Sequence, residues 1–176
     1  MSTRAGEFVT LRELLDEVGP DPIRFMLMAR TADSAVDFDL DLAVEQSDRN
    51  PVYYVQYAHA RIASILRSAQ EMGWDLSGQP DLTLLQHPSE LDLIRKMLEL
   101  PEIIERAADK LSPHFLPFYA QELAGALHTF YRDCRVISSE PSDADLTQAR
   151  LRLVQSAKLV LARVLHLMGM SAPERM

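Results

Sequence analysis

Residues 50–72 read NPVYYVQYAHARIASILRSAQEM, and this stretch decides the fold. Asn50 before Pro51 starts a helix well, because the asparagine side chain can cap the first turn and proline lacks an amide hydrogen that this turn leaves unpaired. At about 100° per residue, one apolar stripe is formed by Val55, Ala58, Ile62, Ile65, Leu66 and Ala69. We therefore predict one long amphipathic helix from Pro51 to about Met72.

Similar signals flank this helix on both sides. The Thr10–Glu13 spacing is that of a capping box, so a short helix should follow and end at Gly19. Asp21 is the expected N-cap of the next helix, with Pro22 at its first position. Further helices are expected at 89–100, 113–136 and from 143 or 145 to 168, and Pro101 either kinks the first of these or begins another. No convincing hairpin or repeat is present, so the predicted fold is an all-α bundle.

The acidic segment after residue 33 needs a separate interpretation. Asp37, Asp39 and Asp41 occupy the first three ligand spacings of a calcium-binding loop. However, Leu42 stands where that loop requires glycine, and Asp48 stands where it requires a bidentate glutamate. A turn that leads into a short helix is the preferred interpretation.

Composition and charge limit the class of protein. The 176 residues are 47% hydrophobic and 25% charged, as in ordinary globular domains, and the single cysteine cannot form an internal disulfide. No membrane span or signal peptide is visible, so we expect a cytoplasmic protein. Net charge is −8, but residues 1–48 carry −7 of it and residues 49–176 only −1. Phosphate contacts would therefore come from local basic patches in the second region.

Sequence signals for catalysis or metal binding are missing. There is no glycine-rich phosphate loop, nucleophile elbow, His-Glu-x-x-His or Cys-x-x-Cys motif. The histidines have no ligand spacing, so surface or core-edge positions are expected for His59, His87, His114, His128 and His166. We predict no catalytic residue and no metal site in this chain.

A second face of the long helix is aromatic and polar. Beside the core stripe lie Tyr54, Tyr57, Arg61 and Ser68, with Tyr53 and Ser64 at the far margin. Aromatic rings and guanidinium planes stack on unpaired bases, and their polar groups read base edges. The alternative is packing at the core boundary with the tyrosine hydroxyls in water. From the spacing alone, boundary packing is preferred.

These residues also carry a family resemblance. Residues 50–62 resemble the signature helix of arginyl-tRNA synthetases, and residues 21–24 resemble the Asp-Ala-Leu-Arg motif of that family's anticodon-binding domain, with Pro22-Ile23 as a departure. Further blocks that match in the same order are 37–42, 130–136 and 168–176. The resemblance covers essentially the whole chain.

Residues 1–10, MSTRAGEFVT, resemble the Lys-Met-Ser-Lys-Ser loop region of a class I synthetase. On this basis Met1, Ser2, Thr3 and Arg4 are the remnant of an ATP-binding loop, with Thr3 where the common pattern has the second lysine. The chain is then expected to be a fragment, divided into a loop remnant and connecting helix at 1–20 and an anticodon-binding domain at 21–176. Residues 1–10 are expected to be poorly ordered or packed non-natively.

The resemblance implies a fold and a function. The fold is the helical bundle of the class I synthetase anticodon-binding type. The parent enzyme ligates arginine to tRNA(Arg) with ATP and magnesium, whereas this chain holds the anticodon stem-loop, binds no cofactor itself, lacks the catalytic nucleotide-binding domain and is inactive alone. It is expected to be a monomer without membrane contact. The implied tRNA contacts are Tyr54, Tyr57, Arg61, Arg135 and Met176.

Other interpretations stay open at this stage. Arg135 could instead solvate a bundle edge or pair with Asp133 or Glu122. The chain could be a stand-alone helical module that interacts with tRNA or protein, or the anticodon-binding domain of another synthetase. The run from Tyr54 to Arg61 favours the arginine enzyme.

Overall fold

Eight α-helices and two 3-10 turns follow one another in the part of the chain that this computed structural model describes, residues 3–4, 7–8, 10–31, 33–35 and 38–176. The α-helices are α1 (Leu11–Val18), α2 (Pro20–Met28), α3 (Leu40–Val44), α4 (Pro51–Glu71), α5 (Pro88–Leu98), α6 (Leu100–Asp109), α7 (Phe115–Asp133) and α8 (Ala144–Leu167). The 3-10 turns are η1 (Leu82–Leu84) and η2 (Pro141–Asp143). The predicted all-α bundle is confirmed.

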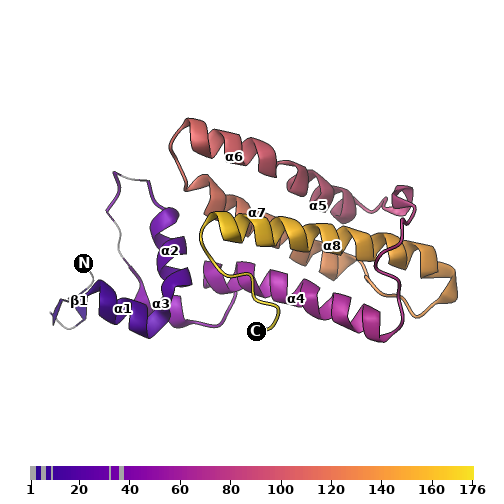
Figure 1. The fold of residues 1–176 in the computed structure, drawn as a ribbon, viewed down its shortest axis with the longest axis horizontal. Coiled ribbons are helices and arrows are strands. Elements are labelled where there is room, and N and C mark those ends of the chain that lie inside the picture. The colour runs from indigo at the N-terminus through magenta and orange to yellow at the C-terminus, as the bar shows by residue number, and fades with distance from the viewer. Residues whose placement is uncertain (1–2, 5–6, 9, 32, 36–37) are drawn as a thin grey trace.

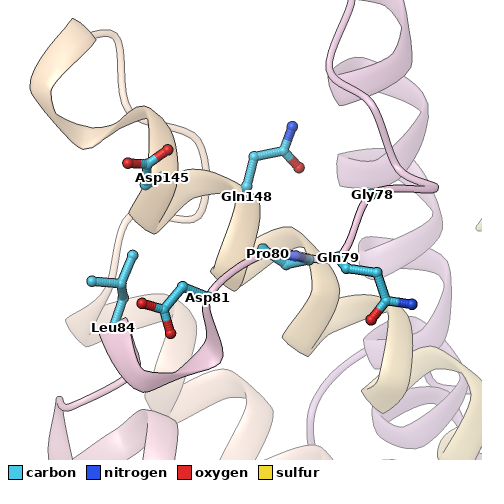
Figure 2. Close-up of a pocket in the computed structure, with 7 residues that line it drawn as sticks. All are labelled: Gly78, Gln79, Pro80, Asp81, Leu84, Asp145 and Gln148. Atoms are coloured by element: carbon cyan, nitrogen blue, oxygen red, sulfur yellow. The ribbon is translucent and has the colours of Figure 1, made fainter.

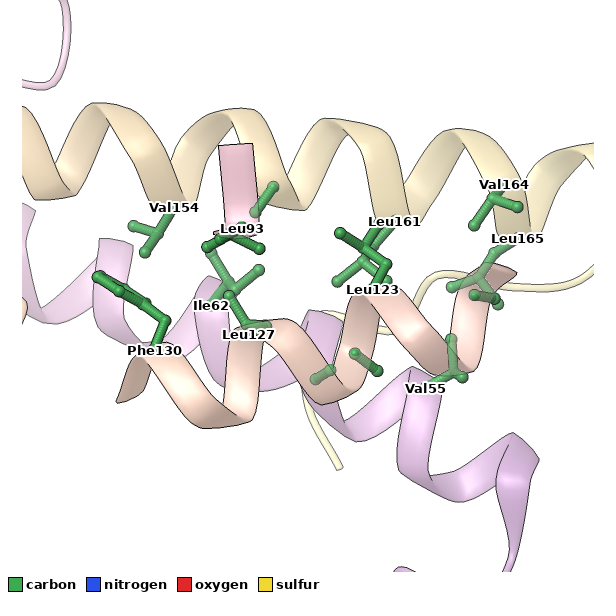
Figure 3. Packing of buried hydrophobic residues seen from close by; sticks show 14 of the residues in the cluster. Val55, Ile62, Leu93, Leu123, Leu127, Phe130, Val154, Leu161, Val164 and Leu165 are labelled. Atoms are coloured by element: carbon green, nitrogen blue, oxygen red, sulfur yellow. The ribbon is translucent and has the colours of Figure 1, made fainter. Parts of the chain in front are cut away.

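The main core lies between α4, α5, α7 and α8. In Figure 1, α4 and α8 run alongside each other with α7 between and behind them, while α5 and α6 cover the far side of α7. Figure 3 shows apolar side chains converging from these helices, among them Val55, Ile62, Leu93, Leu123, Leu127, Phe130, Val154 and Leu161. All of these side chains are fully enclosed. The apolar stripe predicted for α4 therefore faces the core, which leaves its tyrosines at the edge of the bundle.

The first three helices form a smaller unit at one end of the bundle (Figure 1). Ile23, Phe38 and Ala43 are its buried centre, and partly buried Leu14 and Val18 of α1 pack on them. These side chains form a cluster separate from the main core. The predicted division of the chain after residue 20 stays a prediction.

Asn50 fixes the point where the small unit passes into α4. Its side-chain oxygen accepts hydrogen bonds from the amides of Val52 (3.1 Å) and Tyr53 (3.4 Å). Its side-chain nitrogen donates to the carbonyls of Ala43 (3.2 Å) and Glu45 (2.9 Å). The residue is 4% exposed, and its side chain is hydrogen-bonded at both ends. The predicted cap of the long helix is therefore confirmed, and it also ties the end of α3 to the start of α4.

The start of α2 differs from the prediction. The helix begins at Pro20 with Gly19 as its N-cap, and no side chain caps it. Gly19 has φ +76°, a left-handed conformation that suits glycine as the residue between α1 and α2. The carboxylate of Asp21, predicted to be the cap, instead accepts hydrogen bonds from Gln56 and Ser171.

The structure bears on two other points that the sequence left open. Pro101 does not kink a helix but lies in the first turn of α6, where its missing amide hydrogen costs nothing. Asp39 caps α3 by accepting from the amide of Leu42 at 2.9 Å. Asp37, another residue of the calcium alternative, lies outside the described residues.

The N-terminal segment contains a small element that the sequence pattern did not indicate. β1 (Thr3–Arg4) pairs antiparallel with β2 (Glu7–Phe8). Two residues per strand are too few to produce an alternating pattern. Met1 and Ser2 of the predicted ATP-loop remnant lie outside the described residues, as do residues 5, 6 and 9. The predicted poor order of residues 1–10 stays a prediction.

Candidate nucleic-acid interface

The predicted aromatic face of α4 lies at the edge of the bundle, next to α7. Val55 is completely buried in the core, Tyr54 and Tyr57 are half-buried, and Arg61 is exposed. The helical wheel turns all three side chains away from the core stripe, and packing against α7 covers the two tyrosines in part. The structure therefore brings together three of the predicted contact residues on one surface.

Ring contacts continue this surface from α4 onto α7. Tyr53 and Tyr57 have ring centroids 5.9 Å apart and planes within 13° of parallel. Tyr57 and His128 of α7 have centroids 6.2 Å apart and planes within 15° of parallel. Such offset, near-parallel rings are a favourable aromatic geometry. Three rings thus succeed one another across the two helices, with orientations on which a planar base can stack.

Tyr54 has a different environment from Tyr57. Its ring tilts by 40° against His128, with centroids 4.7 Å apart, and it packs against the main core. Its hydroxyl lies near Gly125, where an added Cβ would be 3.6 Å away. Burial, and then the charge of Asp48, raise the pKa of Tyr54. Tyr54 is thus largely committed to joining α4 to α7, while Tyr57 and Arg61 are the more accessible part of the face.

Arg61 is a positive charge without a partner in the described part of the chain. Neither a hydrogen bond nor an ion pair is formed by its guanidinium there, although it acts electrostatically on both His128 and Tyr131. Burial, and then the charge of Arg61, lower the pKa of His128, which favours a neutral imidazole at neutral pH. An unpaired guanidinium beside neutral aromatic rings suits contact with phosphates and bases.

Two polar atoms of α7 complete this region. The Nε2 atom of His128 and the hydroxyl oxygen of Tyr131 are buried without a hydrogen-bond partner in the described residues. Burial raises the pKa of the Tyr131 hydroxyl, and the charge of Arg61 opposes this rise. The sequence reasoning did not select either residue as a contact. Their i, i+3 spacing places them on one face of α7, but only the packing of α7 against α4 brings that face to the tyrosines.

The C-terminal residues follow a different side of α4. Gln56 Nε2 donates to the carbonyl of Ser171 (3.1 Å), and Arg67 Nη1 donates to the carbonyl of Glu174 (3.1 Å). Between them, His59 Nδ1 is 2.8 Å from the carbonyl oxygen of Pro173. On the helical wheel, Gln56, His59 and Arg67 lie roughly 110–170° from the middle of the face formed by Tyr54, Tyr57 and Arg61. Met176 is 55% exposed just beyond this anchored stretch, and its role as a tRNA contact stays a prediction.

Arg135 lies just past the end of α7 and is exposed. Its carbonyl accepts a hydrogen bond from Arg150 Nη1 at 2.8 Å, so its backbone is held in place. The alternative partners considered for its side chain are engaged elsewhere, because Asp133 pairs with Arg132 and Glu122 pairs with Lys96. Arg135 also stays a predicted contact.

One pocket of the molecule does not suit a polyanion. The pocket in Figure 2, about 450 Å³, is lined by Asp81 and Asp145 together with uncharged side chains. Two carboxylates without a basic neighbour in the lining would repel phosphate. In the described residues there is no group of three or more His, Cys, Asp or Glu side chains that could hold a metal ion. No helix there has both the length and the apolar character that spanning a lipid bilayer requires.

Known proteins resemble this chain along its whole length. Residues 55–176 match the family described as the DALR anticodon binding domain. An arginine–tRNA ligase of Dehalococcoides mccartyi is 57% identical over the whole chain, and one of Heliobacterium modesticaldum is 53% identical. The chain spans about 31% and 32% of their lengths. The solved arginyl-tRNA synthetase of Thermus thermophilus is 35% identical, with a TM-score of 0.73 over 91% of this chain and 27% of that one. The chain therefore belongs to the DALR anticodon binding domain family, in the form that arginine–tRNA ligases carry.

Proposed function

We propose that this chain binds the anticodon stem-loop of tRNA(Arg) through the surface formed by Tyr53, Tyr57, Arg61 and His128, named here the aromatic surface. The observation that carries the proposal is the succession of near-parallel rings beside an unpaired guanidinium, in a domain of an anticodon-binding family. Unpaired bases stack on aromatic rings irrespective of sequence, and hydrogen bonds at their edges add identity. The domain would contribute binding energy that positions tRNA and would break no bond itself.

The charge distribution supports this location. Much of the negative charge lies in residues 1–48, outside α4 and α7. Among the described residues Arg61 on the aromatic surface has no carboxylate partner, whereas other basic side chains of the bundle, such as Lys96 and Arg106, are paired with carboxylates. Arg135 and Met176 are proposed as additional contacts outside this surface.

We further propose that the domain works in the cytoplasm, as a monomer, together with the catalytic domain of an arginine–tRNA ligase. That enzyme would use ATP and magnesium to join arginine to tRNA. Met1 to Arg4 are proposed as part of its ATP-binding loop, and no further step is assigned to them. The chain alone should not activate arginine.

The second candidate function is a stand-alone helical module that binds tRNA or protein without ligase activity. The exposed side chains of Leu111 (88%) and Leu167 (38%) line one apolar hollow, which favours some surface contact of this bundle with protein. Both functions allow binding of RNA, but only the first requires a preference for the arginine anticodon loop. The specificity of RNA binding therefore decides between them.

The test compares binding of the 176-residue chain to synthetic stem-loop RNAs at constant salt. One RNA carries an arginine anticodon, and the others share its stem but have unrelated loops. Preference for the arginine loop supports the proposal, and equal affinity for all loops contradicts it. Arginine-dependent pyrophosphate exchange with added tRNA tests the lack of catalysis, which turnover above a buffer control would contradict.

A further inference from the structure

The buried polar atoms of α7 are not explained by the fold. His128 Nε2 and the Tyr131 hydroxyl are enclosed in protein without a hydrogen-bond partner among the described residues. Burying a polar group without a partner costs stability, and native proteins rarely retain such groups without a functional reason. Because the two residues are three apart on α7 and both lie near Arg61, the unpaired atoms belong to one region of the molecule.

Elsewhere in the bundle, rings of the same kind are satisfied. The Tyr119 hydroxyl donates to the carbonyl of Lys96 at 2.9 Å. The Nδ1 atom of His59 lies 2.8 Å from the carbonyl oxygen of Pro173. The bundle can therefore supply partners to buried tyrosine and histidine side chains. The unpaired atoms of His128 and Tyr131 are the exception, and they lie at the aromatic surface. Their position points to a hydrogen-bond partner that comes from outside the chain.

We infer that His128 and Tyr131 hydrogen-bond the edge of one splayed nucleobase of the bound RNA loop. The inference rests on the proposed function and extends it from stacking to reading of a base. A hydroxyl both donates and accepts, and a neutral imidazole offers one donor and one acceptor nitrogen, so together they match the mixed pattern of a base edge. A phosphate offers only acceptors, and a neutral histidine is a poor site for it.

The enclosed state of these atoms means that a side chain must move before a base reaches them. Arg61 is suited to this movement because it is exposed, lies near both groups, and has no hydrogen bond or ion pair to break in the described structure. Once displaced, its guanidinium remains beside the base and can contact the adjoining phosphate. The free protein thus holds the reading groups closed, and RNA binding opens them.

The first experiment measures the stability of the free chain. Tyr131→Phe removes an unpaired hydroxyl and should leave the midpoint of urea unfolding unchanged or raised. Tyr119→Phe, the matched control, removes a hydrogen-bonded hydroxyl and should lower that midpoint. If both variants lower it equally, Tyr131 has a partner within the fold and the inference is wrong.

The second experiment measures RNA binding with a synthetic stem-loop that carries an arginine anticodon, and with versions that lack one loop base each. His128→Phe combined with Tyr131→Phe keeps both rings but removes both polar groups, and should weaken binding about three- to tenfold per lost hydrogen bond. One abasic position should weaken binding to the unmodified chain and cause a smaller loss in this double variant, because only the hydrogen-bond part of the contact is already missing there.

The outcomes separate the inference from the proposed function. If the unmodified chain does not prefer the arginine stem-loop, both are wrong. A different result overturns the inference alone. In that case the unmodified chain binds the arginine stem-loop and Tyr57→Ala weakens this binding, but the double variant keeps the affinity of the unmodified chain and the same loss at each abasic position. His59→Phe provides the control for loss of a satisfied histidine away from the aromatic surface.

Discussion

The side-chain amide of Gln56 on α4 donates a hydrogen bond to the carboxylate of Asp21 on α2, with 2.8 Å between nitrogen and oxygen. The same carboxylate oxygen accepts from the amide and the hydroxyl of Ser171 in the C-terminal segment. One carboxylate thus joins three segments, the small helical unit, the long helix of the aromatic surface and the chain end. Asp21 therefore acts as a junction between these segments and not as the helix N-cap that the sequence predicted.

Replacement of Asp21 by alanine should loosen this junction. Three hydrogen bonds to a charged acceptor are lost, so the free energy of unfolding should fall by about 1–3 kcal/mol. Hydrogen exchange should increase in α2 and at Ser171 while the core of α7 stays protected. Asp16→Ala, an exposed carboxylate on α1, is the control. Equal exchange at Ser171 in both variants would show that the junction does not hold the chain end.

Glu90 forms the best-enclosed ion pair among the described residues. Its side chain is 1% exposed, lies 2.7 Å from Arg150 Nε, and also accepts from the amide of His87. Glu90→Ala leaves Arg150 largely buried without its countercharge and should cost about 3–5 kcal/mol, as is usual for a broken buried pair. Glu102→Ala breaks an exposed pair with Arg106 and should cost less than about 0.5 kcal/mol. Denaturant unfolding of both variants checks this prediction, and similar losses would contradict it.

RNA binding should depend on Tyr57 and Arg61. A base stacked on an aromatic ring is typically stabilised by about 1–3 kcal/mol, so Tyr57→Ala or Arg61→Ala should weaken binding of the arginine stem-loop roughly five- to a hundredfold at constant salt. Arg163→Ala removes the same charge from an exposed position on α8 and should have a much smaller effect. Each variant must keep its helical circular dichroism and melting temperature. If folded Tyr57→Ala and Arg61→Ala chains bind as tightly as the original, the anticodon is read elsewhere.

Stability should decrease when the solution becomes mildly acidic. Burial is the main cause that lowers the pKa of both His59 and His128 below the ordinary value of 6.5. As the pH falls below about 6.5, the unfolded chain therefore takes up more protons than the folded chain, and the free energy of unfolding falls. Urea unfolding at pH 7.5 and 5.5 measures this loss. His128→Phe should reduce the difference in the free energy of unfolding between pH 7.5 and pH 5.5. If that difference is unchanged, protonation of His128 does not cause the loss of stability.

The family assignment and most helices could be predicted from local patterns. Asn50 with Pro51, the Thr10–Glu13 box and Gly169 mark helix ends through interactions that span only a few residues. The apolar stripe of α4 likewise showed which side would face the core. Where a local pattern competed with tertiary contacts, as at Asp21, the prediction was wrong, because the carboxylate gained more partners from Gln56 and Ser171 than one cap would provide.

The candidate site was predictable only in part. By itself, the sequence determined that Tyr54, Tyr57 and Arg61 share one face, because helical periodicity alone sets this. It did not reveal that His128 and Tyr131 adjoin that face, or that the C-terminal residues follow another side of α4. Those relationships depend on how α7 and the chain end pack on α4, and packing is decided by the combined fit of side chains far apart in the sequence. Helix positions follow from local hydrogen bonds and periodicity, whereas the composition of the aromatic surface arises only when separate helices meet.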